Sequence, residues 1–322
     1  MSPVSEALPV VLVSKVEPRP VAEKWLIDQL WAASGVGIVG GQARTYKTWL
    51  AADIALAVAA GTSALGRFEA RIHGPVLVFA AEDDPPTMRV RFEAVAEARG
   101  VRLANTPLFL IDVPELCLND PRQLERLATT VQRHKPRLLV LDPFVRLVRG
   151  LDENSAHDVS GILGALRGIQ RTFDVAVMLV HHMRKSPSSH PGHQLRGSSD
   201  FAAWSDSALY LTRQGDERLL TIEHRAAAAP EPIVVRLDTT PAPHLAVRED
   251  NGDKRAAVTA EDPLHAAILR RLSASPRPQT TSHLRDRLHV RNATLTEALK
   301  ELAACGRIVH GEQGGWSLPE KT

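Results

Sequence analysis

Residues 40–48 read Gly40-Gly41-Gln42-Ala43-Arg44-Thr45-Tyr46-Lys47-Thr48. From Gly41 to Thr48 they fit the phosphate-binding pattern G-x-x-x-x-G-K-[ST], except that Tyr46 stands where the pattern has its second glycine. The stretch before the pattern predicts a strand at residues 35–39, and the Ala- and Leu-rich stretch after it predicts a helix at residues 48–60. Strand, loop and helix in this order are the setting in which such a pattern binds phosphate.

A loop of this kind binds a nucleotide with backbone and side-chain groups. Backbone N–H groups and the N-terminus of the helix surround the phosphates. The Lys47 ammonium would contact the β- and γ-phosphates of ATP, and the Thr48 hydroxyl would bind Mg²⁺. The alternative for the motif taken alone is a strand–turn–helix with a chance Lys-Thr pair, which the rest of the chain disfavours. The expected nucleotide-binding residues are Gly41, Gln42, Ala43, Arg44, Thr45, Tyr46, Lys47 and Thr48.

The composition is typical of a soluble globular protein, with 44% hydrophobic and 24% charged residues among 322. The net charge is only +2, so any contact with nucleic acid must come from local patches. Cys117 and Cys305 are far apart in the sequence and suggest neither a metal site nor a disulfide framework. The sequence shows no membrane-spanning run and no signal pattern, so we expect a cytoplasmic protein without membrane contact.

Strands that alternate with amphipathic helices from Val36 onward predict an α/β fold, with a mostly parallel sheet and helices on both faces. One helix begins at Asp84-Pro85-Pro86 and ends at Gly100, and another carries apolar residues at helical spacing from Val159 to Ile169. The apolar runs that indicate buried strands are residues 76–81, 108–111, 138–142 and 175–180. The runs that predict an antiparallel extension of the sheet are residues 208–212, 219–224 and 233–237.

Pattern and composition divide the chain into three parts. Residues 1–240 are expected to form the α/β domain, with a loose lead-in at residues 1–10. Residues 241–261 are polar and rich in Pro, Asp and Arg, which predicts a linker. Residues 262–319 predict three short helices and a hairpin, the elements of a small winged-helix domain.

Two carboxylates follow buried strands at the edge where open α/β sheets bind their ligands. Asp142 ends the strand at residues 138–142 and is expected to hold Mg²⁺ opposite Thr48, although an aspartate in this place is also common without a nucleotide. Glu82 follows the neighbouring strand, where a carboxylate would orient and polarise the water that attacks the γ-phosphate. The alternative role, a cap for the following helix, suits Asp84 better than Glu82.

Polar residues end the strand at residues 175–180 and continue into a long polar loop. His181 and His182 come first, and we assign to His181 the sensing of the γ-phosphate. The loop that follows carries cations able to grip a nucleic-acid backbone without reading its sequence, as do Arg146 and Arg149 in an earlier loop. The histidines match no standard zinc spacing. The cationic loop residues expected at DNA are Lys185, His190, His193 and Arg196.

Together these elements resemble the RepA-like branch of the RecA-fold ATPases, which includes hexameric replicative DNA helicases of plasmids. The resemblance covers residues 25–237 and implies a homo-oligomeric ring, expected to be a hexamer, with ATP sites at subunit interfaces. It also implies that Glu82 is the catalytic glutamate and that loops facing a central channel contact single-stranded DNA. Besides the phosphate loop, the markers are Trp49-Leu50-Ala51, Ala81-Glu82-Asp83-Asp84-Pro85, Leu141-Asp142-Pro143, His181-His182-Met183-Arg184-Lys185 and Arg196-Gly197-Ser198-Ser199.

The chain departs from that family at two places. Tyr46 replaces a glycine, so its side chain must point away from the phosphates. In having an aromatic residue at this position, the chain is similar to relatives of this branch. The Tyr46 ring would slow nucleotide exchange or stack on the base. The family's arginine finger falls near Asp206 by spacing and is absent there. Arg225 is the best substitute as a catalytic residue, and Arg213 is another.

The C-terminal part lies outside this resemblance. Its third helix carries Arg291 and Lys300 and would enter a major groove of duplex DNA with its N-terminal residues at the base edges. Winged helices also serve as protein-docking modules, so the partner of this part stays open.

Three functions compete. The first is a ring-forming, DNA-stimulated ATPase that acts as a helicase or translocase in replication of a plasmid or similar element. The second is a non-motor, ATP-dependent switch or loader that assembles on DNA or recruits a partner without unwinding. The third, a small-molecule kinase, is disfavoured because the sequence shows no acceptor-binding constellation and no lid.

Overall fold

The computed structural model describes residues 10–18, 20, 23–150, 156–182, 198–215, 217–248, 263–275, 278–288, 290, 292–304, 306–311 and 315–319. The chain divides into two compact units, Met1–Glu249 and Asp250–Thr322. Each unit has a hydrophobic core of its own.

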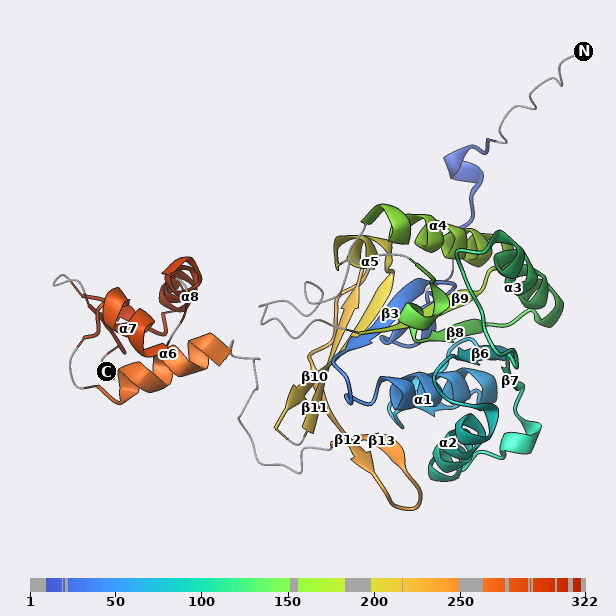
Figure 1. The fold of residues 1–322 in the computed structure, drawn as a ribbon, viewed down its shortest axis with the longest axis horizontal. Coiled ribbons are helices and arrows are strands. Elements are labelled where there is room, and N and C mark those ends of the chain that lie inside the picture. Colours follow the sequence, from blue (N-terminus) through green and yellow to red (C-terminus); the bar gives the residue numbers. More distant parts are fainter. Residues whose placement is uncertain are drawn as a thin grey trace, which may run out of the picture. The chain divides into compact units, whose positions relative to one another are not determined.

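A nine-stranded sheet forms the centre of the first unit (Figure 1). The strands from β10 to β7 run parallel, whereas β11, β12 and β13 extend the sheet in antiparallel fashion. The predicted α/β class, with a mostly parallel sheet and an antiparallel extension, is therefore confirmed. In spatial order the strands are β13 (His244–Val247), β12 (Ile233–Asp238), β11 (Glu217–His224), β10 (Ser207–Gln214), β3 (Val36–Gly41), β9 (Ala176–His182), β8 (Leu138–Asp142), β6 (Val76–Ala80) and β7 (Leu108–Leu110).

The central strands are apolar along their whole length because both faces of the sheet are covered. The strands β3 and β8 are buried at every residue. The strand β3 also carries Gly37 at its pairing with β10, where a Cβ atom would lie only 1.8 Å from the carbonyl oxygen of Ser207. A glycine is therefore required for β10 to pair with β3.

Helices cover the two faces of this sheet (Figure 1). The helices α1 (Lys47–Ala60) and α2 (Pro85–Arg99) lie on one face, called here the α1 face. The helices α3 (Pro121–His134), α4 (Ala156–Phe173) and α5 (Ser198–Trp204) lie on the other, the α4 face. In the part of the chain that the structure describes, no helix is both long and apolar enough to cross a membrane.

Local signals explain where the helices begin and end. The Asp84 carboxylate accepts a hydrogen bond from the Thr87 N–H, Pro85 stands in the first turn of α2, and Gly100 closes it in the left-handed conformation. The helix α1 is buried along nearly all of its length, as its mostly apolar sequence predicts. The helix α3 lies in a stretch for which the sequence analysis predicted no element, and only Leu127 and Val131 of this helix are buried.

Short elements complete the first unit. They are η1 (Val13–Lys15), β1 (Trp25–Ile27), β2 (Trp31–Ala32), β4 (Ser63–Ala64), β5 (Phe68–Glu69), η3 (Leu103–Asn105) and η4 (Phe144–Leu147). The segment from Trp25 to Trp31 packs on the core, where Leu26, Ile27, Leu30 and Trp31 are at most 1% exposed.

The interpretation of residues 241–261 as a linker is wrong at its start. Residues His244–Val247 form β13, which pairs with β12 and ends the sheet. Leu245 is fully buried in the core of the α1 face, and its carbonyl accepts a hydrogen bond from Arg99. Long-range pairing thus overrides a composition that is typical of linkers.

The second unit contains α6 (Pro263–Ser273), α7 (Thr281–Leu288), α8 (Asn292–Ala304) and a hairpin of β14 (Val309–His310) and β15 (Trp316–Ser317). Gln279 exchanges two backbone hydrogen bonds with Trp316, which adds a third short strand position to the hairpin. Apolar residues of the three helices and Ile308 form the core of this unit.

Candidate nucleotide-binding site

Three parallel strands end at the same edge of the sheet, with β9 between the first of them and the other two. Gly41 ends β3, Ala80 ends β6 and Asp142 ends β8, and Ala80 is paired with Asp142. Carboxyl ends of parallel strands are where open α/β sheets bind ligands. The phosphate loop and the two predicted carboxylates, Glu82 and Asp142, therefore meet at this edge.

The loop between β3 and α1 is tight. Arg44 and Tyr46 both have positive φ angles, 62° and 68°. The Thr45 hydroxyl donates to the Gln42 carbonyl at 2.8 Å. A Cβ atom on Gly41 would lie 2.5 Å from the Thr45 hydroxyl oxygen and 2.8 Å from the Leu211 carbonyl oxygen, so only glycine fits there. These contacts fold the loop over the N-terminus of α1, the arrangement that binds anions.

Lys47 begins α1 and lies inside this loop. Its Nζ donates to the Gln42 carbonyl at 2.8 Å, and the residue is only 7% exposed. Burial lowers the pKa of Lys47 from 10.5 to about 8, while the carboxylates of Asp142 and Glu82 act in the opposite direction. The ammonium has therefore already lost most of its water before an anion arrives.

Thr48 and Asp142 meet across the site. The Thr48 hydroxyl donates a hydrogen bond to the Asp142 carboxylate. Burial raises the pKa of Asp142 from 3.8 to about 6, against the effects of the Thr48 hydrogen bond, Lys47 and Arg91. A hydroxyl and a carboxylate are the hard oxygen ligands that Mg²⁺ prefers, and the adjacent lysine and loop suit the phosphates of a nucleotide. The residues present thus fit a magnesium nucleotide.

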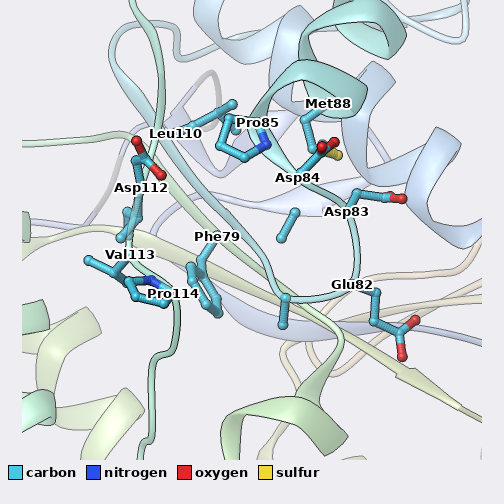
Figure 2. Close-up of a pocket in the computed structure, with 13 residues that line it drawn as sticks. Phe79, Glu82, Asp83, Asp84, Pro85, Met88, Leu110, Asp112, Val113 and Pro114 are labelled. Atoms are coloured by element: carbon cyan, nitrogen blue, oxygen red, sulfur yellow. The ribbon is translucent and has the colours of Figure 1, made fainter.

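Glu82 lies two residues beyond the end of β6. Its carboxylate receives a hydrogen bond from the Arg146 guanidinium at 2.9 Å, and both side chains are partly exposed. It stands at the rim of a pocket of about 450 Å³ between the ends of β6 and β7 and the start of α2. In Figure 2, Glu82 and Asp112 lie on opposite sides of Phe79. The carboxylate is accessible to water, as the predicted catalytic role requires.

The histidine prediction needs correction. His181 is fully buried, stacked on Phe201 at 4.5 Å between ring centroids and edge-on to Phe144 at 5.7 Å. Both aromatic residues belong to the core of the α4 face, opposite the phosphate loop. Side chains alternate along a strand, so the neighbouring His182, paired with Gly41, is directed to the α1 face. A sensing role for His181 does not fit its position.

Arg225 is not brought to the phosphate loop of its own chain. It follows β11 at the opposite edge of the sheet, where its guanidinium contacts Asp206 at 3.5 Å and the Ala203 carbonyl. Asp206, at the spacing expected for the finger, also binds Arg167 at 2.5 Å and the Val36 N–H at 3.0 Å. Asp206 thus ties α4 to the start of β3.

A different arginine, Arg218, lies at the phosphate loop, where the sequence analysis did not predict it. Arg218, near the start of β11, holds its guanidinium carbon 4.8 Å from the centre of the Tyr46 ring. It is only 6% exposed. The sequence signal for Arg218 is its place two residues after the turn between β10 and β11. This turn brings the start of β11 next to the end of β10, at the edge of the sheet where the phosphate loop lies.

Most of the residues expected at DNA lie outside the described part of the chain, namely Lys185, His190, His193, Arg196 and Arg291. Lys300 is exposed on α8. Arg146 and Arg149 are both paired with carboxylates, Arg146 with Glu82 and Arg149 with Glu115. In the described residues these two arginines therefore stabilise the loop after β8.

A phosphate loop, a buried lysine and a threonine–aspartate pair at the carboxyl edge of a parallel sheet define the nucleotide site of a P-loop ATPase. A family model described as an AAA domain matches residues 2–188, more than half of the chain. The chain belongs to this family.

Two solved structures are similar in fold. With the ATPase domain of G40P the chain shares 14% sequence identity at a TM-score of 0.48, over 64% of this chain and 82% of that chain. With the RadB recombinase it shares 18% identity at a TM-score of 0.47, over 64% of this chain and 88% of that chain. No curated protein matches the chain.

Proposed function

We propose that this protein is a ring-forming ATPase that acts as a DNA helicase or translocase, of the type that serves replication of a plasmid or other mobile element. The observation that carries the ATPase part is the meeting of Lys47, Thr48 and Asp142 at one edge of the sheet. The helicase part is supported by the five sequence segments shared with the RepA-like branch.

Each site residue has a separate task in this proposal. The N–H groups of the loop and the Lys47 ammonium bind the phosphates, with Lys47 leaving the Gln42 carbonyl for the β- and γ-phosphate oxygens. Thr48 and Asp142 would hold Mg²⁺, which when bound neutralises phosphate charge and polarises the γ-phosphate. Glu82 orients the attacking water and accepts its proton. His182, on the face of the loop, replaces His181 as the candidate that senses the γ-phosphate.

Assembly and DNA contacts extend this proposal. A hexamer would bring Arg225 of one subunit, at the far edge of its sheet, to the nucleotide of the next. Lys185, His190, His193 and Arg196 would line the channel for single-stranded DNA. The order helix, strand position, helix, helix and hairpin in the second unit supports a winged-helix domain at residues 262–319. Arg291 and Lys300 would make its contacts with duplex DNA, or it would dock a protein.

One observation favours the second function, a non-motor switch or loader. At the spacing of the arginine finger stands Asp206, which is engaged in holding α4 and β3 together. Arg225 is in turn tied to Asp206 and to the Ala203 carbonyl. A ring that lacks a free finger would bind ATP and assemble, yet turn over too slowly to drive unwinding.

ATP hydrolysis measured with and without single-stranded DNA tests the proposal, with Lys47→Ala as the blank. Strong stimulation by DNA, absent in Lys47→Ala, together with unwinding of a forked duplex supports the helicase. Slow hydrolysis that DNA does not change, with DNA binding but no unwinding, supports the switch. Absence of any ATP binding by the folded protein refutes both.

A further inference from the structure

The irregular position of the phosphate loop is held by a second segment of the chain. Tyr46, the last residue before α1, has φ 68° and ψ 25°. Glycine adopts this left-handed conformation readily, whereas a residue with a Cβ atom is strained in it. The Tyr46 ring packs at the edge of the core on the α1 face, with the guanidinium carbon of Arg218 4.8 Å from its centre.

The sheet topology brings Arg218 to this place. The strand β10 pairs with β3, with Leu211 opposite Gly41, and the hairpin returns as β11 with Arg218 opposite Arg213. Arg218 shares its face of β11 with Leu220 and Ile222, which is the face on which α1 lies. It is 6% exposed. A cation over an aromatic ring is attracted most strongly where water is excluded.

We propose that Arg218 is a positioning residue of the nucleotide site and that it acts through Tyr46. Its stack on the ring keeps the Tyr46 backbone left-handed, so that the N–H groups at the start of α1 remain directed at the phosphates. Tyr46 and Arg218 together thus do what a glycine does alone in the usual loop. The inference rests on the proposed binding of ATP to this loop.

A double-mutant cycle of nucleotide affinity tests the coupling. The full chain and its variants are titrated with a fluorescent ATP analogue in the presence of Mg²⁺. Arg218→Met keeps an unbranched side chain but removes the charged guanidinium that lies over the ring, and it should weaken binding about fivefold to thirtyfold. In a Tyr46→Gly background the same change should alter the affinity less than about twofold, because glycine needs no stack.

Further variants separate this role from a general effect on the fold. Tyr46→Leu removes the ring and with it the stack, so it should show the same loss of affinity as Arg218→Met. The control is Arg236→Met, which removes an exposed arginine on β12 that is paired with Asp238, and it should leave the affinity unchanged. Thermal unfolding shows that each variant is folded.

Three results would overturn the inference. An equal loss from Arg218→Met in both backgrounds would mean that Arg218 acts on the nucleotide or on the fold, without Tyr46. Wild-type affinity in Tyr46→Leu would mean that the ring has no role in the loop, a result that counts even if Arg218→Met does not fold. A folded wild type that binds no nucleotide would reject the proposed function, and the inference with it.

Discussion

At the scale of single residues, the site is built by burying charged groups next to one another. Lys47 and Asp142 are each only 7% exposed. Their pKa values move towards each other, to about 8 and about 6, because burial disfavours both charged forms. Such a pair is costly to the fold because each group loses its water, and a bound magnesium nucleotide would add a further opposite charge beside each group.

The raised pKa of Asp142 predicts a pH dependence of stability. Between pH 3.8 and about 6, Asp142 is mostly protonated in the folded protein and mostly ionised in the unfolded chain. The stability that this proton contributes is therefore fully present below pH 3.8 and is lost as the pH rises through 6. Relative to Asp142→Asn, the unfolding free energy of the wild type should fall by about 3 kcal/mol over this window. Urea unfolding of the wild type and of Asp142→Asn at several pH values measures this change. A difference in unfolding free energy between the two proteins that stays constant with pH would contradict the prediction.

Substitution of Glu82 should separate ATP binding from ATP hydrolysis. Glu82→Gln should bind ATP with unchanged affinity, because Lys47 and the loop remain, while hydrolysis should fall at least about a hundredfold, because an amide does not accept the proton of the attacking water. Steady-state hydrolysis and nucleotide titration measure the two effects. The matched control is Glu93→Gln, an exposed glutamate paired with Arg89 on α2, which should hydrolyse ATP normally. Normal turnover in Glu82→Gln would remove Glu82 from the mechanism.

At the scale of elements, the position of the phosphate loop depends on how closely β3 and β10 pair. Their register places Ser207 opposite Gly37 and Leu211 opposite Gly41. This pairing brings the β10–β11 hairpin, and with it Arg218, to the loop. The start of β3 is fixed by Asp206, which joins it to Arg167 of α4. The strand β3, which leads into the phosphate loop, is thus held at its start by Asp206 and at its end by the pairing with β10.

Two glycine substitutions should have opposite effects on stability. Gly37→Ala would place a Cβ atom 1.8 Å from the Ser207 carbonyl oxygen and should cost more than about 3 kcal/mol, or prevent folding. Gly164→Ala, at an exposed position of α4 with nothing within 4 Å of a Cβ atom, should stabilise the protein by about 0.5–1 kcal/mol. Thermal and urea unfolding compare them. Equal stability of the two variants would mean that β3 and β10 are not closely paired.

At the scale of the whole molecule, two compact units share one chain. All residues of the nucleotide site lie in the first, and the second has a separate core that includes Ile268, Leu284 and Leu299. A unit that buries its own core does not depend on the other for its fold.

Removing residues 250–322 should therefore leave nucleotide binding and most of the ATP hydrolysis intact. Hydrolysis within a factor of about two to three of the full chain is expected, because no site residue is lost. Hydrolysis assays and light scattering on the shortened and full-length proteins check this. A shortened protein that loses both the ring and hydrolysis would instead make the second unit an assembly element.

Much of the fold was predictable because its signals are local. The continuous apolar run at residues 138–142 indicated a strand buried on both faces, and the Asp84-Pro85 pair indicated the start of α2. The helix α3 was missed although its signals are local too, since Asp120-Pro121 starts it and Leu124, Leu127, Ala128 and Val131 stand at helical spacing. The strand β13 was taken for linker because its partner, β12, provides a pairing that its own composition does not reveal.

By itself, the sequence determined the class of fold and the chemical groups of the site: the order of strands, loop and helices, and the presence of Lys47, Thr48, Glu82 and Asp142. Only the tertiary structure decided which groups face one another. It turned His182 rather than His181 towards the loop, placed Arg225 at the far edge and brought Arg218 onto Tyr46. The physical reason is that motifs and periodicity describe neighbours along the chain. Which side chains face one another, and at what distance, depends on strands paired across more than a hundred residues.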